Sequence, residues 1–149
     1  MPDRTPLDAG PLGRLCRPNA RPAPNREIAI WFTEILRSGE VELVVPEISD
    51  FEVRRELIRA GLTQSVSRLD ALKNDLLYLP LDTPTLHRAA ELWAEARNRG
   101  IPTGDPRELD CDVILAAQAE RIGRTIVTEN VGHLSRFLTT RHWRDLASP

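Results

Sequence analysis

Short apolar segments alternate with longer amphipathic segments along the chain, and this alternation limits the possible folds more than any other feature of the sequence. The segments expected to form strands lie around residue 7 and at residues 42–45, 77–81 and 125–128. The segments expected to form helices cover residues 26–38, 46–60, 65–75, 83–99 and 109–122. Parallel strands need crossover connections of this kind, so the alternation predicts an α/β fold with a mainly parallel sheet of about four to five strands.

Capping and turn residues mark where several of these elements begin and end. Asn25 stands where it can cap the helix that follows it, and Thr83 followed by Pro84 is typical of a helix start. Asp82 is adjacent to that start, so we expect it to cap the helix rather than to act in catalysis. Loops are expected at residues 17–25 and 100–107. Residues 141–146 are compatible with either a strand or a helical turn.

The length and composition fit a single domain that spans residues 1–149, in which 41% hydrophobic residues suffice for a buried core. The chain has no apolar run of the ~18–20 residues that a membrane span needs, and its first ten residues lack the apolar core of a signal peptide. Cys16 and Cys111 lie far apart without a Cys-x-x-Cys spacing, so we expect free thiols. These features predict a cytoplasmic protein without a membrane segment.

Charge is distributed unevenly along the chain. Overall, 20 basic and 22 acidic residues give a formal net charge of −2, which argues against a protein that simply coats nucleic-acid phosphates. Residues 1–26 and 121–149 each contain five arginines and two acidic residues, whereas the segment between them has 10 basic and 18 acidic residues. Because the ends are basic and the middle is acidic, the net charge does not exclude nucleic acid as a ligand.

Acidic and amide side chains follow several of the expected strands. Asp8 and Asn130 each follow a strand, and Glu52 lies one to two turns into the helix after another strand. Asp110 and Asp112 open a further helix. In parallel sheets, ligands bind beyond the carboxyl ends of the strands, where loops lead into helix N-termini. We therefore expect all five side chains at the same edge of the sheet.

The helix at residues 46–60 combines an apolar stripe with charged side chains. At 100° per residue, the positions expected to be buried are Ile48, Phe51, Ile58 and Leu62. Glu52 lies on the border of this stripe and Arg55 lies within it. Burying such charges costs several kcal/mol unless they are paired or bound to a cation, so the helix indicates a polar site.

A cluster of carboxylates at one edge needs a cation. At an effective dielectric constant of 20, two carboxylates ~5 Å apart repel each other by ~3 kcal/mol. Oxygen ligands alone suit the hard ions Mg²⁺ and Mn²⁺. Ions of this kind can activate a water molecule and stabilise the departing oxygen in phosphodiester cleavage.

Each of these residues also has a simpler explanation. Asp8 can initiate an Asp-Ala-Gly-Pro turn, and Asn130 can cap the turn that follows it. Asp110 and Asp112 can cap their helix and interact with its dipole. Glu52 can pair with an arginine of its own helix or remain solvated. It is the coincidence of these residues at one edge that favours the functional interpretation.

Four segments resemble motifs of the PIN-domain metal-dependent nucleases, in particular the VapC-type toxins, and the resemblance covers nearly the whole chain. Residues 7–12 (Leu-Asp-Ala-Gly-Pro-Leu) resemble the first-strand motif with its aspartate, and residues 48–55 resemble the segment that carries the family's glutamate. Residues 109–119 give the most specific match, because the family places its third carboxylate just before an Ile-x-Ala-Ala run. In that register Asp112 is the ligand and Asp110 is a neighbour.

The fourth motif resembles residues 128–134, with Asn130 where many members of the family have aspartate and His133 where many have a second acid. The neutral Asn130 puts a second metal site in doubt. His133 is interpreted either as a group for phosphate binding or proton transfer, or as an incidental loop histidine.

The resemblance implies a three-layer α/β/α fold and hydrolysis of RNA phosphodiester bonds with Mg²⁺ or Mn²⁺. It assigns Asp8, Glu52 and Asp112 as the metal ligands and catalytic residues, with Asp110 and Asn130 assisting them. It also implies an antitoxin partner, a segment of which occupies the acidic groove, and a homodimer formed through helices near residues 42–60. Candidates for contacts to RNA phosphates are Arg14, Arg17, Arg136 and Arg141.

Two other functions fit parts of the pattern. The first is a catalytically degenerate PIN-like module that binds RNA or a partner protein without cleaving RNA. The second is a metal-dependent phosphatase, because an aspartate after the first strand also begins the haloacid dehalogenase pattern. That pattern requires a second aspartate two residues later, where this chain has Gly10, so the sequence disfavours it.

Overall fold

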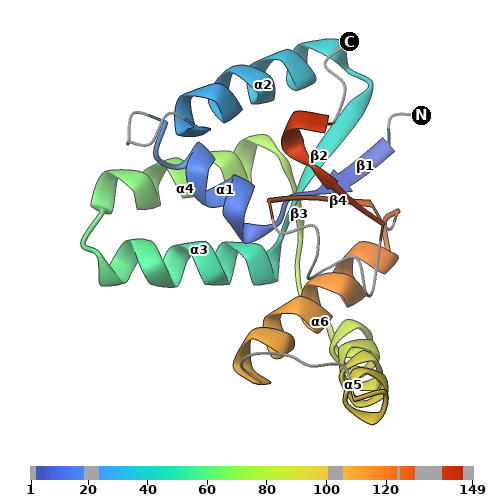
Figure 1. The fold of residues 1–149 in the computed structure, drawn as a ribbon. Helices are drawn as coiled ribbons and strands as arrows, with labels where there is room; N and C mark the ends of the chain where they lie inside the picture. The colour runs from blue at the N-terminus through green and yellow to red at the C-terminus, as the bar shows by residue number, and fades with distance from the viewer. Residues whose placement is uncertain (1–2, 19–23, 101–105, 124, 130–138, 146–149) are drawn as a thin grey trace.

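The computed structural model describes residues 3–18, 24–100, 106–123, 125–129 and 139–145 (Figure 1). Its helices are α1 (Ala9–Leu15), α2 (Pro24–Ser38), α3 (Glu47–Arg59), α4 (Thr63–Asp75), α5 (Thr83–Asn98) and α6 (Pro106–Glu120). Its strands are β1 (Asp3–Pro6), β2 (Val41–Pro46), β3 (Leu77–Leu79), β4 (Thr125–Thr128) and β5 (Thr139–His142), and the 3-10 helix η1 (Trp143–Asp145) follows β5. In these ranges no helix is both long enough and apolar enough to cross a membrane.

The strands form a parallel sheet in the order β3-β2-β1-β4-β5, joined at Leu7. β1 pairs with β2, β2 with β3, and β4 with β5, all in parallel. Leu7 forms a parallel bridge with Val127, and its N–H donates to the Val44 carbonyl at 3.0 Å. The Asp8 N–H donates to the Val127 carbonyl at 2.9 Å. Because all these pairings are parallel, β1, β2 and β4 end at the same edge of the sheet.

Helices cover both faces of this sheet. Val127 of β4 belongs to an apolar cluster with residues of α1, α2, α3 and α4, whereas the neighbouring Ile126 belongs to a cluster with residues of α5 and α6. Successive residues of a strand point to opposite faces, so the two clusters lie on opposite sides of the sheet. The predicted three-layer α/β/α arrangement is therefore confirmed, as is the mainly parallel sheet.

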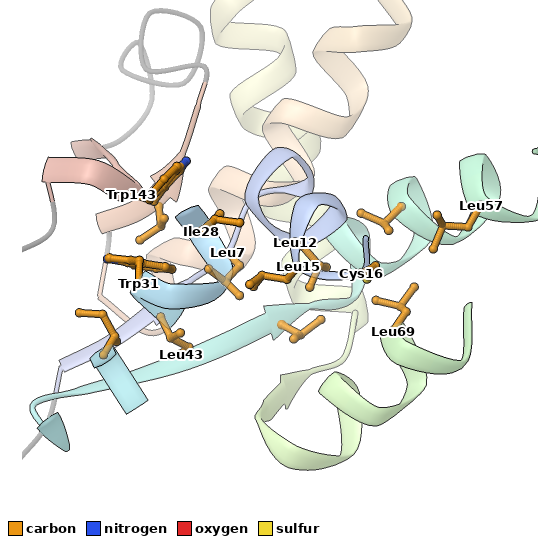
Figure 2. Packing of buried hydrophobic residues seen from close by; sticks show 14 residues of the cluster. Leu7, Leu12, Leu15, Cys16, Ile28, Trp31, Leu43, Leu57, Leu69 and Trp143 are labelled. Carbon is orange, nitrogen blue, oxygen red and sulfur yellow. The ribbon is translucent and has the colours of Figure 1, made fainter. Parts of the chain in front are cut away.

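The first cluster packs α1 and α2 onto the sheet, as Figure 2 shows. Leu7 and Leu12 are fully buried in it. Trp31 of α2 and Trp143 of η1 face each other with their ring centroids 6.0 Å apart (Figure 2). This contact holds η1, close to the C-terminus, against α2, which follows the first strand and helix.

The sequence does not predict helix α1, because the segment contains two glycines and a proline and reads as a turn. The helix forms because Asp8 caps it: Asp8 Oδ1 accepts a hydrogen bond from the Ala9 N–H at 2.7 Å. Leu12 and Leu15 then bury their side chains on one side of the helix. Pro11 lies in the first turn, where the missing N–H costs little. The short turn after Asp8 is therefore the start of a helix.

The predicted buried face of α3 is wrong in part: Ile48 is buried as predicted, but Phe51 and Ile58 are not. Phe51 is 53% exposed and Ile58 is 63% exposed, and Arg55 is also exposed. The residues that α3 buries most deeply beyond its first turn are Val53 and Leu57. The apolar spacing alone therefore oriented the helix incorrectly, since it gave no weight to a polar residue in the core.

That polar residue is Asp50, which is only 6% exposed. Its Oδ1 accepts from Arg54 Nε at 3.0 Å and its Oδ2 accepts from the Tyr78 hydroxyl at 3.0 Å. The Tyr78 hydroxyl also lies 3.1 Å from Glu47 Oε2, while Glu47 Oε1 accepts from the Leu81 N–H at 2.8 Å. Burial and the two neighbouring carboxylates raise the pKa of Tyr78. This network orients α3 against the end of β3, so the Asp50 side of the helix faces inward.

Several predicted boundaries change in the structure. Asn25 lies inside α2 and is buried, so it does not act as the predicted cap. Asp82, as expected, caps α5, because its Oδ1 accepts from the Thr85 N–H at 2.9 Å. Helix α6 begins at Pro106, so Asp110 and Asp112 lie inside it and do not open it. The sequence was compatible with either a strand or a helical turn near the end of the chain, and residues 139–145 form both: a strand and then a 3-10 helix.

Candidate active site

Asp8 lies where β1 ends and α1 begins. Its two carboxylate oxygens have separate partners: Oδ1 accepts from the Ala9 N–H at 2.7 Å and Oδ2 accepts from the Thr128 hydroxyl at 2.7 Å. Burial raises the pKa of Asp8, these two hydrogen bonds act against that rise, and the nearby Glu129 charge adds to it. The sequence analysis did not select Thr128, although its position at the end of β4 placed it at this edge.

Glu52 lies in the second turn of α3, and the pKa of its carboxyl group is strongly raised. Its pKa is raised to about 7, mainly by burial and in addition by the negative charges of Asp8 and Asp112. The charge of Arg55 and a hydrogen bond with the Cys111 thiol act in the opposite direction. The structure therefore places Glu52 close enough to both Asp8 and Asp112 for their charges to raise its pKa.

The carboxylates of Asp8, Glu52 and Asp112 are suitable ligands for a hard divalent cation, which would also offset the repulsion between them. Their donor atoms are all oxygen, as Mg²⁺ and Mn²⁺ require, and the pKa of Glu52 is raised first by burial and then by the charges of Asp8 and Asp112. As they stand, no three Asp, Glu, His or Cys side chains in the described part of the chain are grouped tightly enough to hold a metal ion. The structure thus contains a group of neighbouring carboxylates rather than a preformed metal cage.

Glu129 is a fourth carboxylate at this edge, and the sequence analysis did not select it. It accepts hydrogen bonds from Arg14 Nε and, at 3.1 Å, from Trp143 Nε1. Arg14 also donates through one terminal nitrogen to Asn25 Oδ1 at 2.7 Å. The rule that selected Asn130, a polar residue at a strand end, applied equally to its neighbour Glu129. This ion pair fixes Arg14 of α1 beside the acidic group.

A cleft of about 490 Å³ opens between α1, α2 and α3 at this edge. Its charged lining includes Arg14, Arg17, Glu52, Arg55 and Glu129. Arg14 and Arg17 therefore lie near the acidic group, as the sequence analysis predicted. Arg55 joins them because α3 exposes it. Of the three central carboxylates only Glu52 lines the cleft, where it lies with Glu129 and the arginines.

Other predicted site residues lie elsewhere. Arg141 of β5 lines a separate cavity of about 330 Å³ together with Asp3 and Thr125, which begin their strands, so it lies towards the amino ends of the sheet. Asp110 lines a third, mainly apolar cavity with Trp93 of α5. The structure therefore separates these two residues from the cleft. The predicted residues Asn130, His133 and Arg136 lie outside the described residues.

The family follows from comparison with known proteins. Residues 22–136 match the PIN domain. This chain belongs to the PIN-domain family. PIN domains are generally nucleases, and the family expected from the four motifs is confirmed. The match begins after Asp8, so the assignment of this residue depends on its position in the structure.

Several solved structures have a similar fold. They include VapBC2 from Rickettsia felis bound to a DNA fragment from their promoter (TM-score 0.71, 18% identity, 94% of this chain and 98% of that chain). They also include DNA-bound VapBC from Salmonella typhimurium (TM-score 0.68, 17% identity, 96% of this chain and 99% of that chain). FitAcB from Neisseria gonorrhoeae is a further example (TM-score 0.63, 18% identity, 95% of this chain and 99% of that chain). No curated protein matches this chain. At these identities the similarity concerns the fold.

Glu52 makes the stability of the metal-free protein depend on pH. Its pKa is about 7 in the folded protein and 4.5 without the fold, so the unfolded chain releases the proton first as the pH rises. The stability that the protonated group supplies is complete below about pH 4.5 and is lost as the pH rises through about 7. We expect Glu52→Gln to stabilise the metal-free protein by on the order of 2 kcal/mol at pH 8 and much less at pH 5.

Thermal unfolding in EDTA at both pH values measures this effect. Glu56→Gln is the matched control, because Glu56 lies on the same helix but is exposed, and its pKa is lowered by Arg59. This control should not be stabilised at pH 8. Equal melting temperatures of wild type and Glu52→Gln at pH 8 would show that Glu52 is not in a crowded, buried environment.

Proposed function

We propose that the protein is a Mg²⁺- or Mn²⁺-dependent endoribonuclease of the cytoplasm and the toxin of a toxin–antitoxin pair. The observation that carries this proposal is the convergence of Asp8, Glu52 and Asp112 beside a cleft with three arginines. Such a group costs free energy unless a cation binds it. A phosphodiester backbone, in turn, needs both a cation at the reacting phosphate and positive charge for its neighbours.

The residues of the chain have distinct roles in this proposal. Asp8, Glu52 and Asp112 would hold the ion, which when bound supplies an activated water molecule and neutralises charge on the phosphate oxygens. Thr128 and the Ala9 N–H fix the orientation of the Asp8 carboxylate. Asp110 and Asn130 are proposed as assisting residues, although Asp110 lines a different cavity.

The arginines of the cleft would bind phosphates next to the one that is cleaved. Arg14 is held by Glu129 and Asn25, which leaves one of its two terminal nitrogens without a hydrogen-bond partner among the described residues. Arg17 and Arg55 are exposed at the cleft. Such side chains bind backbone phosphates without regard to base sequence. They would therefore position RNA, and the cleavage site would depend on other contacts.

Cleavage of single-stranded RNA with Mn²⁺ tests the catalytic proposal. We expect Asp8→Asn, Glu52→Gln and Asp112→Asn each to reduce the rate by at least about a hundredfold, because each removes charge that the ion requires. EDTA should abolish cleavage by the wild type. The control is Glu42→Gln in β2, an acidic residue paired with Arg4 at the amino ends of the strands, and it should retain the wild-type rate.

Equal cleavage with and without EDTA, or unchanged rates in the three variants, would contradict the proposal. If the wild type bound RNA but did not cleave it, the degenerate binding module would be the correct alternative. Turnover of a small phosphate ester but not of RNA would instead favour the phosphatase.

RNA affinity without metal tests the arginines. In EDTA, the double variant Arg17→Ala/Arg55→Ala should bind single-stranded RNA about tenfold more weakly, and the slope of log K against log salt should fall by about 1.4, or ~0.7 for each lost phosphate contact. Arg141→Ala is the matched control and should stay within about twofold of wild type. Fluorescence anisotropy measures both. A larger effect for Arg141→Ala would show that RNA binds at the other edge of the sheet.

The proposed protein partner is a small antitoxin. The support is the similarity of fold to chains from VapBC complexes and a cleft in which both positive and negative side chains are open to a partner. We expect expression of the wild type to arrest bacterial growth, Asp8→Asn to be harmless, and co-expression of the protein encoded beside it to restore growth. Normal growth with the active wild type would contradict the toxin role.

A homodimer is also proposed, and the exposed apolar residues of α3 support it. Phe51 and Ile58 lie seven residues apart on one side of α3 and are both more than half exposed, and neighbouring exposed apolar side chains can mark a contact surface. Arg55 lies over the Phe51 ring at 5.1 Å, so this surface also carries a positive charge. Sedimentation as a monomer at high protein concentration would contradict the dimer.

A further inference from the structure

Helix α3 begins without a side-chain cap of its own. Its N-cap residue is Pro46, which makes no side-chain hydrogen bond to the helix. The first N–H groups of a helix have no acceptor within the helix and need one elsewhere. Ile48, in the first turn, is only 4% exposed, so water does not readily meet this need. The acceptor is Oε1 of Gln118 in α6, at 3.2 Å from the Ile48 nitrogen.

Gln118 makes a second bond to another element. Its Nε2 donates at 2.8 Å to the carbonyl of Leu79, which is the last residue of β3. Gln118 is fully buried, and both halves of its amide are hydrogen-bonded. The two partners fix the orientation of the amide, because one is a donor and the other an acceptor. A single side chain therefore links α6 to the start of α3 and to the end of β3.

The two helices joined in this way carry two of the three central carboxylates. Glu52 follows Ile48 by about one turn on α3, and Asp112 precedes Gln118 on α6. Repulsion between these carboxylates favours separation of the helices, whereas the bond between Gln118 and Ile48 resists it. The linkage lies about one helical turn from Glu52 and nearly two turns from Asp112, so its loss should alter the spacing of the two carboxylates.

We propose that Gln118 is a positioning residue, which caps α3 from α6 and thereby fixes Glu52 opposite Asp112. The consequence for metal binding rests on the function proposed above, whereas the capping itself does not. Removal of a group that holds a metal-binding side chain in place commonly lowers metal affinity by about ten- to a hundredfold.

The test uses Gln118→Met, which keeps the length of the side chain and removes both hydrogen bonds. We expect the Ile48 amide to exchange with solvent at least about tenfold faster, while amides of α2 keep their rates. Calorimetric titration of the full chain with Mn²⁺ should show a dissociation constant roughly tenfold larger. The control is Ile35→Ala in α2, a fully buried residue on the side of α1 and the sheet, which should destabilise the protein but leave the Mn²⁺ dissociation constant within about twofold.

Gln118→Glu provides a second variant if Gln118→Met does not fold. Its carboxylate can still accept from the Ile48 N–H but, when ionised, cannot donate to the Leu79 carbonyl. Protection of the Ile48 amide should persist, and Mn²⁺ affinity should still fall. Unprotected Ile48 in this variant would show that the acceptor at position 118 does not cap α3, and would overturn the inference.

The outcomes separate the two proposals. If the wild type binds Mn²⁺ and Gln118→Met binds it equally well, Gln118 does not position the site. The same conclusion follows if Ile35→Ala weakens Mn²⁺ binding as much as Gln118→Met, because general loss of stability would then explain both. If the wild type itself does not bind Mn²⁺, the proposed metal-dependent function fails, while Ile48 exchange still decides whether Gln118 caps the helix.

Discussion

The backbone at Leu7 and Asp8 connects the two parts of the sheet, and the position of the site follows from this connection. The Leu7 N–H donates to Val44 of β2, and the Asp8 N–H donates to Val127 of β4. The chain is thus held from both sides just before α1 begins, and the buried Leu7 side chain anchors it in the core. Asp8 therefore stands at the carboxyl edge with a fixed backbone, and its carboxylate can be oriented by one hydroxyl and one N–H. A change in register at this point would move the Asp8 carboxylate and would also separate the two parts of the sheet.

Other contacts hold the remaining carboxylates near Asp8 against their mutual repulsion. The Asp50 and Tyr78 network orients α3 from one side, and Gln118 holds its first turn from α6. Asp50 and Gln118 are buried polar side chains with hydrogen-bond partners on other elements, and such directional contacts make the orientation of a helix specific. These contacts hold the carboxylates close together despite their repulsion, as expected for a group that a cation would stabilise.

The sequence predicted what depends on local periodicity and on the geometry of parallel sheets. Most of the strand and helix order followed from these rules, as did a common edge for five polar residues, whereas the choice of Asp112 over Asp110 followed from the resemblance to the family. Sequence reasoning failed where distant contacts decide the outcome. Helix α1 depends on burial of Leu12 and Leu15, and the orientation of α3 depends on Tyr78, which no local pattern connects to Asp50. Glu129 is different, because the strand-end rule already applied to it.

The distribution of arginines shows why net charge is a poor guide to binding by this fold. Both ends of the chain are rich in arginine, yet they meet the sheet at different places. Arg14 and Arg17 lie at the cleft because α1 starts at the carboxyl edge, whereas Arg141 lines a cavity towards the amino ends. Among the described residues, the positive charge at the cleft therefore comes from the first end and from α3, which contributes Arg55. Because Glu129 pairs with Arg14, the cleft is not simply basic. It combines arginines with acidic side chains, an arrangement that suits a phosphate bound together with a divalent ion.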